Sequence, residues 1–157
     1  MRTLAVVLVT LITVACGGED GERLLQSEIA VDYQGDSFDP VFGYAQFIDW
    51  DNDLDAPGHV LLSTSEFECK RDGSGRPENG VVVTVGLPQF IAGSYENVAV
   101  DFTRYRSGLA IDQTMVAAPI EVLEADDEIV SLAAAFDETV DGEPLSLTGE
   151  LTVLRCN

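Results

Sequence analysis

After residue 26, apolar and polar side chains alternate in a series of short runs rich in β-branched and aromatic residues. A period of two places successive side chains on opposite faces of a β-strand, and these residue types favour strands. No stretch repeats its apolar residues with the 3.6-residue period of an amphipathic helix. The pattern therefore predicts an all-β domain. The predicted strand runs are 28–33, 41–48, 59–65, 81–87, 95–105, 115–123, 129–136 and 145–155.

Turn residues separate these runs. Asp141-Gly142 lies between the last two of them, and Asp-Gly before a second alternating run predicts an antiparallel hairpin. About eight short strands with frequent turns favour an antiparallel β-sandwich. A small β-barrel is the alternative, because barrels and sandwiches share the same strand pattern.

The last run assigns side chains to the two faces of its strand. Alternation places Leu147, Leu151 and Val153 on one face, whereas the opposite face is mostly polar. This division predicts a half-buried strand, with one face in the core and the other toward solvent.

The N-terminus has a different pattern. Met1-Arg2 supplies a positive charge, and an uncharged apolar run follows from Leu4 to Val14. Eleven helical residues span roughly 16 Å, about half the hydrocarbon thickness of a bilayer. The run is therefore interpreted as the hydrophobic region of a signal peptide.

The residues that end this run, Thr13-Val14-Ala15-Cys16, resemble the lipobox of bacterial lipoproteins. The resemblance implies that residues 1–15 are a signal peptide and that the thiol of Cys16 receives a diacylglyceryl group in the bilayer. Gly18, rather than Asp, follows at the second position after the cysteine, which by the same resemblance implies the outer membrane or cell surface. Ordinary secretion, with cleavage after Ala15, is the alternative. Residues 16–26 are then a lipidated tether, and 27–157 form a single β domain.

The number of cysteines agrees with lipidation. The chain has three cysteines, and ordinary secretion would leave Cys16 as an exposed free thiol. If Cys16 is acylated, Cys69 and Cys156 remain as one pair. An exported compartment permits oxidation, so a Cys69–Cys156 disulfide is expected.

The charge balance restricts the partners. The chain has 8 basic and 28 acidic residues, giving a net charge of -20. Such a surface repels nucleic acid, and it attracts cationic proteins, cationic glycans and divalent metals. Solubility in a crowded or salty exterior is the simpler explanation of the same charge.

One acidic run is a candidate metal site. Asp49, Asp51, Asp53 and Asp55 stand at alternate positions, as in calcium-binding loops that surround the ion with oxygen ligands. The run departs from the EF-hand pattern, which needs Gly at the position of Leu54. Both a calcium site and a solvated acidic loop therefore remain open.

No catalytic constellation is evident. His59 is the single histidine; Ser63 and Ser65 lie nearby in sequence, but residues spaced along one strand do not converge on a substrate. Neither a G-x-S-x-G nor an H-E-x-x-H motif is present. We therefore expect a non-enzymatic, membrane-tethered binding or structural module. The alternatives are an acidic binder or inhibitor of a cationic protein and a calcium-dependent adhesive module.

Overall fold

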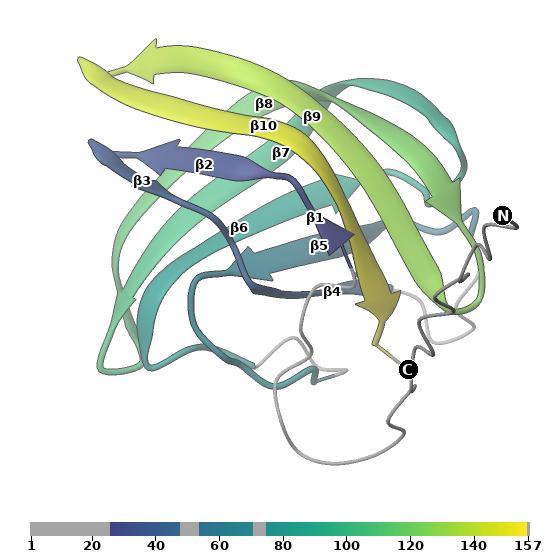
Figure 1. Cartoon of the computed structure of the whole chain (residues 1–157), viewed down its shortest axis with the longest axis horizontal. Coiled ribbons are helices and arrows are strands. Elements are labelled where there is room, and N and C mark those ends of the chain that lie inside the picture. Colours follow the sequence, from purple (N-terminus) through teal and green to yellow (C-terminus); the bar gives the residue numbers. More distant parts are fainter. Residues whose placement is uncertain (1–25, 48–53, 71–74, 157) are drawn as a thin grey trace, which may run out of the picture.

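The computed structural model describes residues 26–47, 54–70 and 75–156 (Figure 1). These residues form ten strands and no helix, so the all-β prediction is confirmed. Every run predicted from alternation contains a strand. Within these ranges no helix has the length and apolar character needed to cross a membrane. The strands are β1 (Gln26–Ser27), β2 (Ala30–Tyr33), β3 (Asp36–Phe38), β4 (Phe42–Phe47), β5 (Gly58–Ser63), β6 (Asn79–Leu87), β7 (Gly93–Arg106), β8 (Leu109–Ala125), β9 (Ile129–Val140) and β10 (Glu143–Arg155).

Seven of these strands close into a barrel. Strands β4 to β10 are antiparallel neighbours in chain order, and β10 then pairs with β4 in parallel at Leu154–Tyr44 and Arg155–Ala45. The expected antiparallel sandwich is therefore wrong, and the alternative, a small β-barrel, is confirmed. The physical reason is that β10 has partners on both edges. It joins the two ends of one curled sheet, whereas a sandwich keeps two sheets separate.

The N-terminal strands lie beside the barrel along β10. The edge of β10 that faces away from β9 pairs in turn with β2, β1 and β4, and β3 pairs with β2. Gly149 permits this arrangement. Its φ is +118°, and a Cβ atom there would collide with the carbonyl oxygen of Glu28. Glycine therefore lets the chain between β1 and β2 pass close to the backbone of β10.

Two-residue turns connect β7 to β8 and β9 to β10. The predicted hairpin across Asp141-Gly142 is confirmed, because β9 and β10 pair antiparallel along almost their whole length. Both turn residues have positive φ, +52° and +91°, as a type I′ turn requires. Ser107-Gly108 connects β7 to β8 in the same way, with φ of +51° and +72°.

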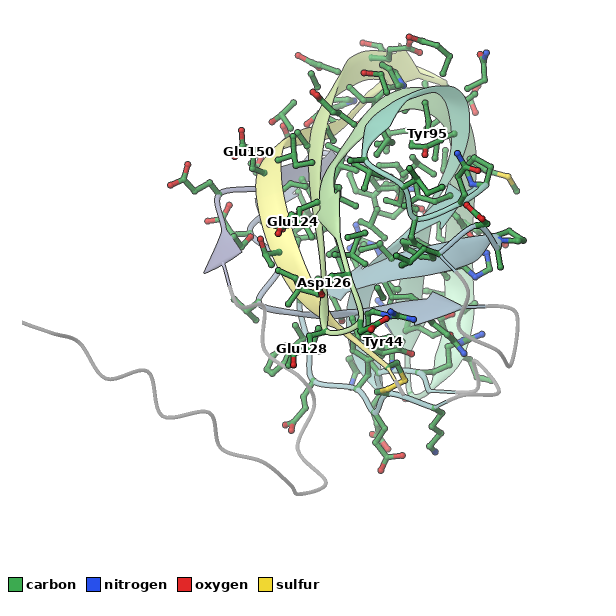
Figure 2. The ribbon with its side chains drawn as sticks, turned by 90° about the vertical axis from the view of Figure 1, so that its right-hand side faces the viewer. Tyr44, Tyr95, Glu124, Asp126, Glu128 and Glu150 are labelled. Carbon is green, nitrogen blue, oxygen red and sulfur yellow. A yellow bond between two sulfur atoms is a disulfide. The ribbon has the colours of Figure 1, made fainter. Side chains whose placement is uncertain are left out.

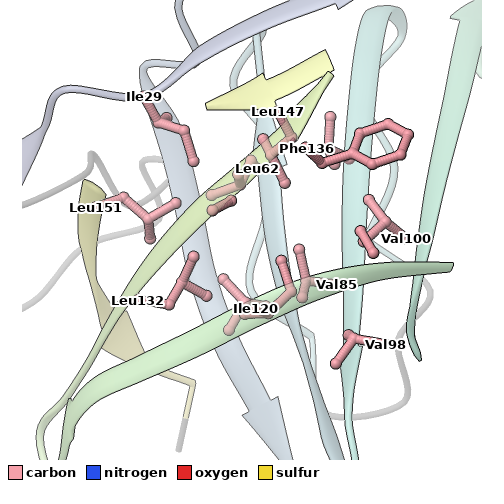
Figure 3. Packing of buried hydrophobic residues seen from close by; sticks show 14 of the residues in the cluster. Ile29, Leu62, Val85, Val98, Val100, Ile120, Leu132, Phe136, Leu147 and Leu151 are labelled. Carbon is pink, nitrogen blue, oxygen red and sulfur yellow. The ribbon is translucent and has the colours of Figure 1, made fainter. Parts of the chain in front are cut away.

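The barrel interior is packed with apolar side chains from all its strands (Figure 3). Leu147, Leu151 and Val153 are at most 2% exposed, which confirms the predicted inner face of β10. Leu132 and Val100 reach the same core from β9 and β7. Burying an aliphatic side chain of this size stabilises the fold by about 1.5–3 kcal/mol.

A second, smaller cluster lies on the outer face of β4, β5 and β6. The segment after β5 folds back over this face, and the ring of Phe67 packs against Tyr44 with centroids 5.0 Å apart. The expected disulfide is present: Cys69 in this segment is bonded to Cys156 after β10, with Cα atoms 5.8 Å apart. The disulfide therefore fastens the segment to the strand that closes the barrel.

Candidate functional site

The sequence-predicted lipidation and metal residues lie mostly outside the described part of the chain. Cys16, Asp49, Asp51 and Asp53 belong to ranges that are not described, and Asp55 is exposed in the turn before β5. Among the described residues, no group of three or more His, Cys, Asp or Glu side chains could hold a metal ion. The calcium site stays a prediction.

His59 lies on β5 between Gln46 of β4 and Gly86 of β6. Burial lowers the pKa of its imidazole from the usual 6.5 and so favours the neutral ring. Ser63 lies four residues along the same strand, roughly 14 Å away at the rise of an extended chain. It is fully buried, and its hydroxyl accepts a hydrogen bond from the backbone N–H of Ser65. The structure therefore does not bring His59 and Ser63 together.

A polar groove of about 440 Å³ runs over the outer face of β5 to β8 beside His59. Asp101 lies in this groove, and its two carboxylate oxygens accept hydrogen bonds from Thr103 Oγ1 at 3.2 Å and Gln113 Nε2 at 2.6 Å. Arg76, from the segment after β5, lines the groove as well. These groups can hold a small polar molecule by hydrogen bonds.

Charge is distributed unevenly over the barrel. Between Leu109 and Leu154 the sequence carries eleven acidic residues and no Lys, Arg or His. All of these acidic side chains are exposed except Asp112, which is half-buried. The exposed charges on the outer surface of β8, β9 and β10 are therefore all negative, and we call this surface the acidic face. Figure 2 labels four of its members, Glu124, Asp126, Glu128 and Glu150.

The β8–β9 turn at the end of the acidic face is fixed by its own hydrogen bonds. Asp126 Oδ1 accepts from the backbone N–H groups of Glu128 at 2.7 Å and Ile129 at 2.9 Å, and these bonds lower the pKa of its carboxyl. The buried Arg155 donates to the carbonyl oxygen of Asp126 at 2.7 Å and pairs with Asp127 at 3.3 Å. Its guanidinium is buried and pairs with one of the three carboxylates of this turn, so the turn keeps a net negative charge.

Arg104 is likewise engaged within the fold. Its Nη1 pairs with Asp36 at 3.0 Å, and its guanidinium carbon lies 5.5 Å from the centre of the Tyr33 ring. The Tyr33 hydroxyl donates to Asp112 Oδ2 at 2.8 Å, and burial raises the pKa of this phenol to about 12. These contacts fasten the β2–β3 hairpin to β7 and β8.

Sequence reasoning missed the first half of β8. The predicted strand begins at Met115, whereas β8 begins at Leu109. Leu109, Ile111 and Met115 are 69%, 48% and 66% exposed, so large apolar side chains point to solvent here. The turn at Ser107-Gly108 is the sequence signal that would have placed the start of this strand correctly.

No protein-family model, no curated protein and no solved structure matches this chain.

Proposed function

We propose that this chain is an exported lipoprotein, anchored through an acylated Cys16, whose barrel is a non-enzymatic module that binds a cationic protein. The observation that carries the proposal is the acidic face: eleven acidic residues and no basic residue between Leu109 and Leu154. A surface of one sign steers an oppositely charged partner toward it and rejects partners of the same sign.

The fold supports binding on the outside of the barrel. Its interior is packed with apolar side chains, so recognition belongs to the outer surface. Arg104 pairs with Asp36, which is not part of the acidic face, and Arg155 pairs with only one of its eleven acidic residues, Asp127. Carboxylates remain ionised at neutral pH, so the attraction operates under ordinary conditions and weakens as salt screens it.

The first test measures binding of a small basic protein, cytochrome c, and of an acidic protein, α-lactalbumin, to the full chain in mild detergent. At about 0.15 M salt the Debye length is about 8 Å, so only close charge pairs contribute. We expect cytochrome c to bind and α-lactalbumin not to bind. Replacing Glu121, Glu124 and Glu138 by Gln should weaken binding about tenfold, since exposed ion pairs contribute about 0.2–1 kcal/mol each.

A matched variant controls for net charge. Replacing Glu66, Glu78 and Glu96 by Gln removes three exposed carboxylates that lie outside the acidic face. This variant should bind cytochrome c nearly as well as the parent chain. Equal losses in the two variants, or equal binding of the acidic and basic proteins, would contradict the proposal.

The anchor and the absence of catalysis have their own tests. The intact mass of the membrane-extracted chain should equal a polypeptide that begins at Cys16 plus its acyl groups, and Cys16→Ser should abolish that added mass. An unmodified mass in the membrane fraction would contradict the anchor. Hydrolysis of a defined substrate that disappears in His59→Ala would contradict the non-enzymatic assignment.

A further inference from the structure

The first half of β8 has a strand neighbour on one edge only. β8 pairs with β7 along most of its length, but it pairs with β9 only between Ile120 and Ala125. Over residues 109–119, the second edge of β8 therefore has no strand partner among the residues that the structure describes. β9 leaves β8 at Ala134 and continues beside β10 to the hairpin tip at the upper left of Figure 1.

An unpaired edge presents backbone N–H and C=O groups that can pair with another strand. Native proteins usually protect such edges with lysine, proline, bulges or short strands. Residues 109–119 contain no lysine, and their one proline, Pro119, stands at the end next to the β9 pairing. A β-bulge at Ile111 interrupts the pairing with β7 near the start of the stretch, and the pairing is regular from Asp112 to Ala118. The exposed side chains of Leu109, Ile111 and Met115 instead add apolar surface to this edge. The stretch is therefore suited to accept a strand.

Charge decides between the two kinds of strand that could pair here. A second copy of this chain would bring together two bodies of net charge -20, which repel one another. A basic segment would meet the exposed carboxylates of Asp137 and Glu138 on the diverging part of β9, and that of Glu121 on β8. Charge complementarity therefore favours a cationic occupant.

We infer that residues 109–119 bind an extended segment of the cationic partner as an added antiparallel or parallel strand. This inference rests on the proposed function and gives its binding mode. Backbone hydrogen bonds to the free edge of β8 hold the segment, and six paired residues extend about 20 Å along it. Apolar side chains of the segment cover Ile111 and Met115 on the outer face. Its alternating Lys or Arg side chains lie on the opposite face, on which Asp112 of β8 and Glu138 of β9 stand by alternation.

The test uses ten-residue peptides of alternating Val and Lys with the full chain in mild detergent. Two N-methylated versions each lack the N–H donors of one peptide edge but keep the charge and side chains. Because an added strand hydrogen-bonds through one edge, N-methylation of that edge should weaken binding at least about tenfold. N-methylation of the other edge should have a much smaller effect.

Protein variants test the apolar part of the site. Ile111→Thr with Met115→Thr removes apolar surface while keeping residues that favour strands, and should weaken binding of the Val-Lys peptide about tenfold. Leu123→Thr is the matched control, because Leu123 is also exposed on β8 but lies where β8 pairs with β9 on its other edge. This control should bind the peptide like the parent chain.

The remaining outcomes separate the two proposals. One outcome is that the peptide binds equally well with either edge N-methylated and yet loses binding when the carboxylates of the acidic face are replaced. That result would overturn strand addition but leave the proposed function standing. Failure of every basic probe to bind at about 0.15 M salt would overturn both. A dimer in sedimentation experiments that disappears in the Ile111→Thr, Met115→Thr variant would assign the edge to a second copy and overturn the cationic occupant.

Discussion

Removing the disulfide between Cys69 and Cys156 should take away a large part of the folding stability. The bond joins residues that are 87 positions apart in sequence. For a loop of this length, the chain-entropy model gives about 4–5 kcal/mol of stabilisation through the unfolded state. The total stability of a domain is only about 5–15 kcal/mol, so this is a large fraction of it. The change to make is Cys69→Ala with Cys156→Ala, in a Cys16→Ser background that prevents thiol exchange.

The assay is equilibrium unfolding in urea followed by far-UV circular dichroism. With a slope near 2 kcal/mol per molar urea, the midpoint should fall by about 2 M. The Cys16→Ser chain held in reductant should unfold at the same midpoint as the double alanine variant, since both lack the bond. A midpoint within about 0.3 M of the oxidised chain would refute the reasoning, because the bond would then not constrain the unfolded state.

Three further predictions concern single residues. Gly149→Ala should destabilise the barrel by more than about 2 kcal/mol in thermal unfolding, because the added Cβ meets the Glu28 carbonyl. Gly142→Ala should lose less stability, because Gly142 also has a positive φ but has open space around it. Burial lowers the pKa of His59, so protonation favours the unfolded chain, and the free energy of unfolding should fall as the pH drops below about 6.5. In His59→Gln, the urea midpoint should change less between pH 7 and pH 5 than it does in the parent chain. Tyr33 should ionise only near pH 12 in an ultraviolet titration, and Tyr33→Phe should remove that late step.

The strands could be predicted from sequence because alternation is a local property. Every predicted run contains a strand, and the hairpin at Asp141-Gly142 follows from two adjacent residues. Barrel closure is different, because it depends on pairing between Tyr44 and Leu154. Those two strands have the same alternation that they would show in a sandwich, so only their meeting in space distinguishes the folds. The three-residue strand β3 was missed because it is too short to show a period.

Of the candidate binding surface, only its negative charge could be predicted from the sequence. The net charge pointed to a cationic partner, but the unpaired edge of β8 depends on where β9 diverges from it at Ala134. No local pattern marks that point. The start of β8 was missed because the consecutive polar residues Asp112, Gln113 and Thr114 interrupt the alternation on which the prediction rested, and because the outward-facing Leu109 and Ile111 are apolar.

Barrel closure by β10 has a consequence for biosynthesis. The ring is completed by β10, the last strand of the described residues, which must find β4 across most of the described sequence. A polypeptide in which β10 has not yet been synthesised therefore lacks the strand that closes the barrel. Contacts between such distant segments also form slowly. Until β10 joins β4, the apolar side chains of the other six barrel strands therefore cannot form the closed core.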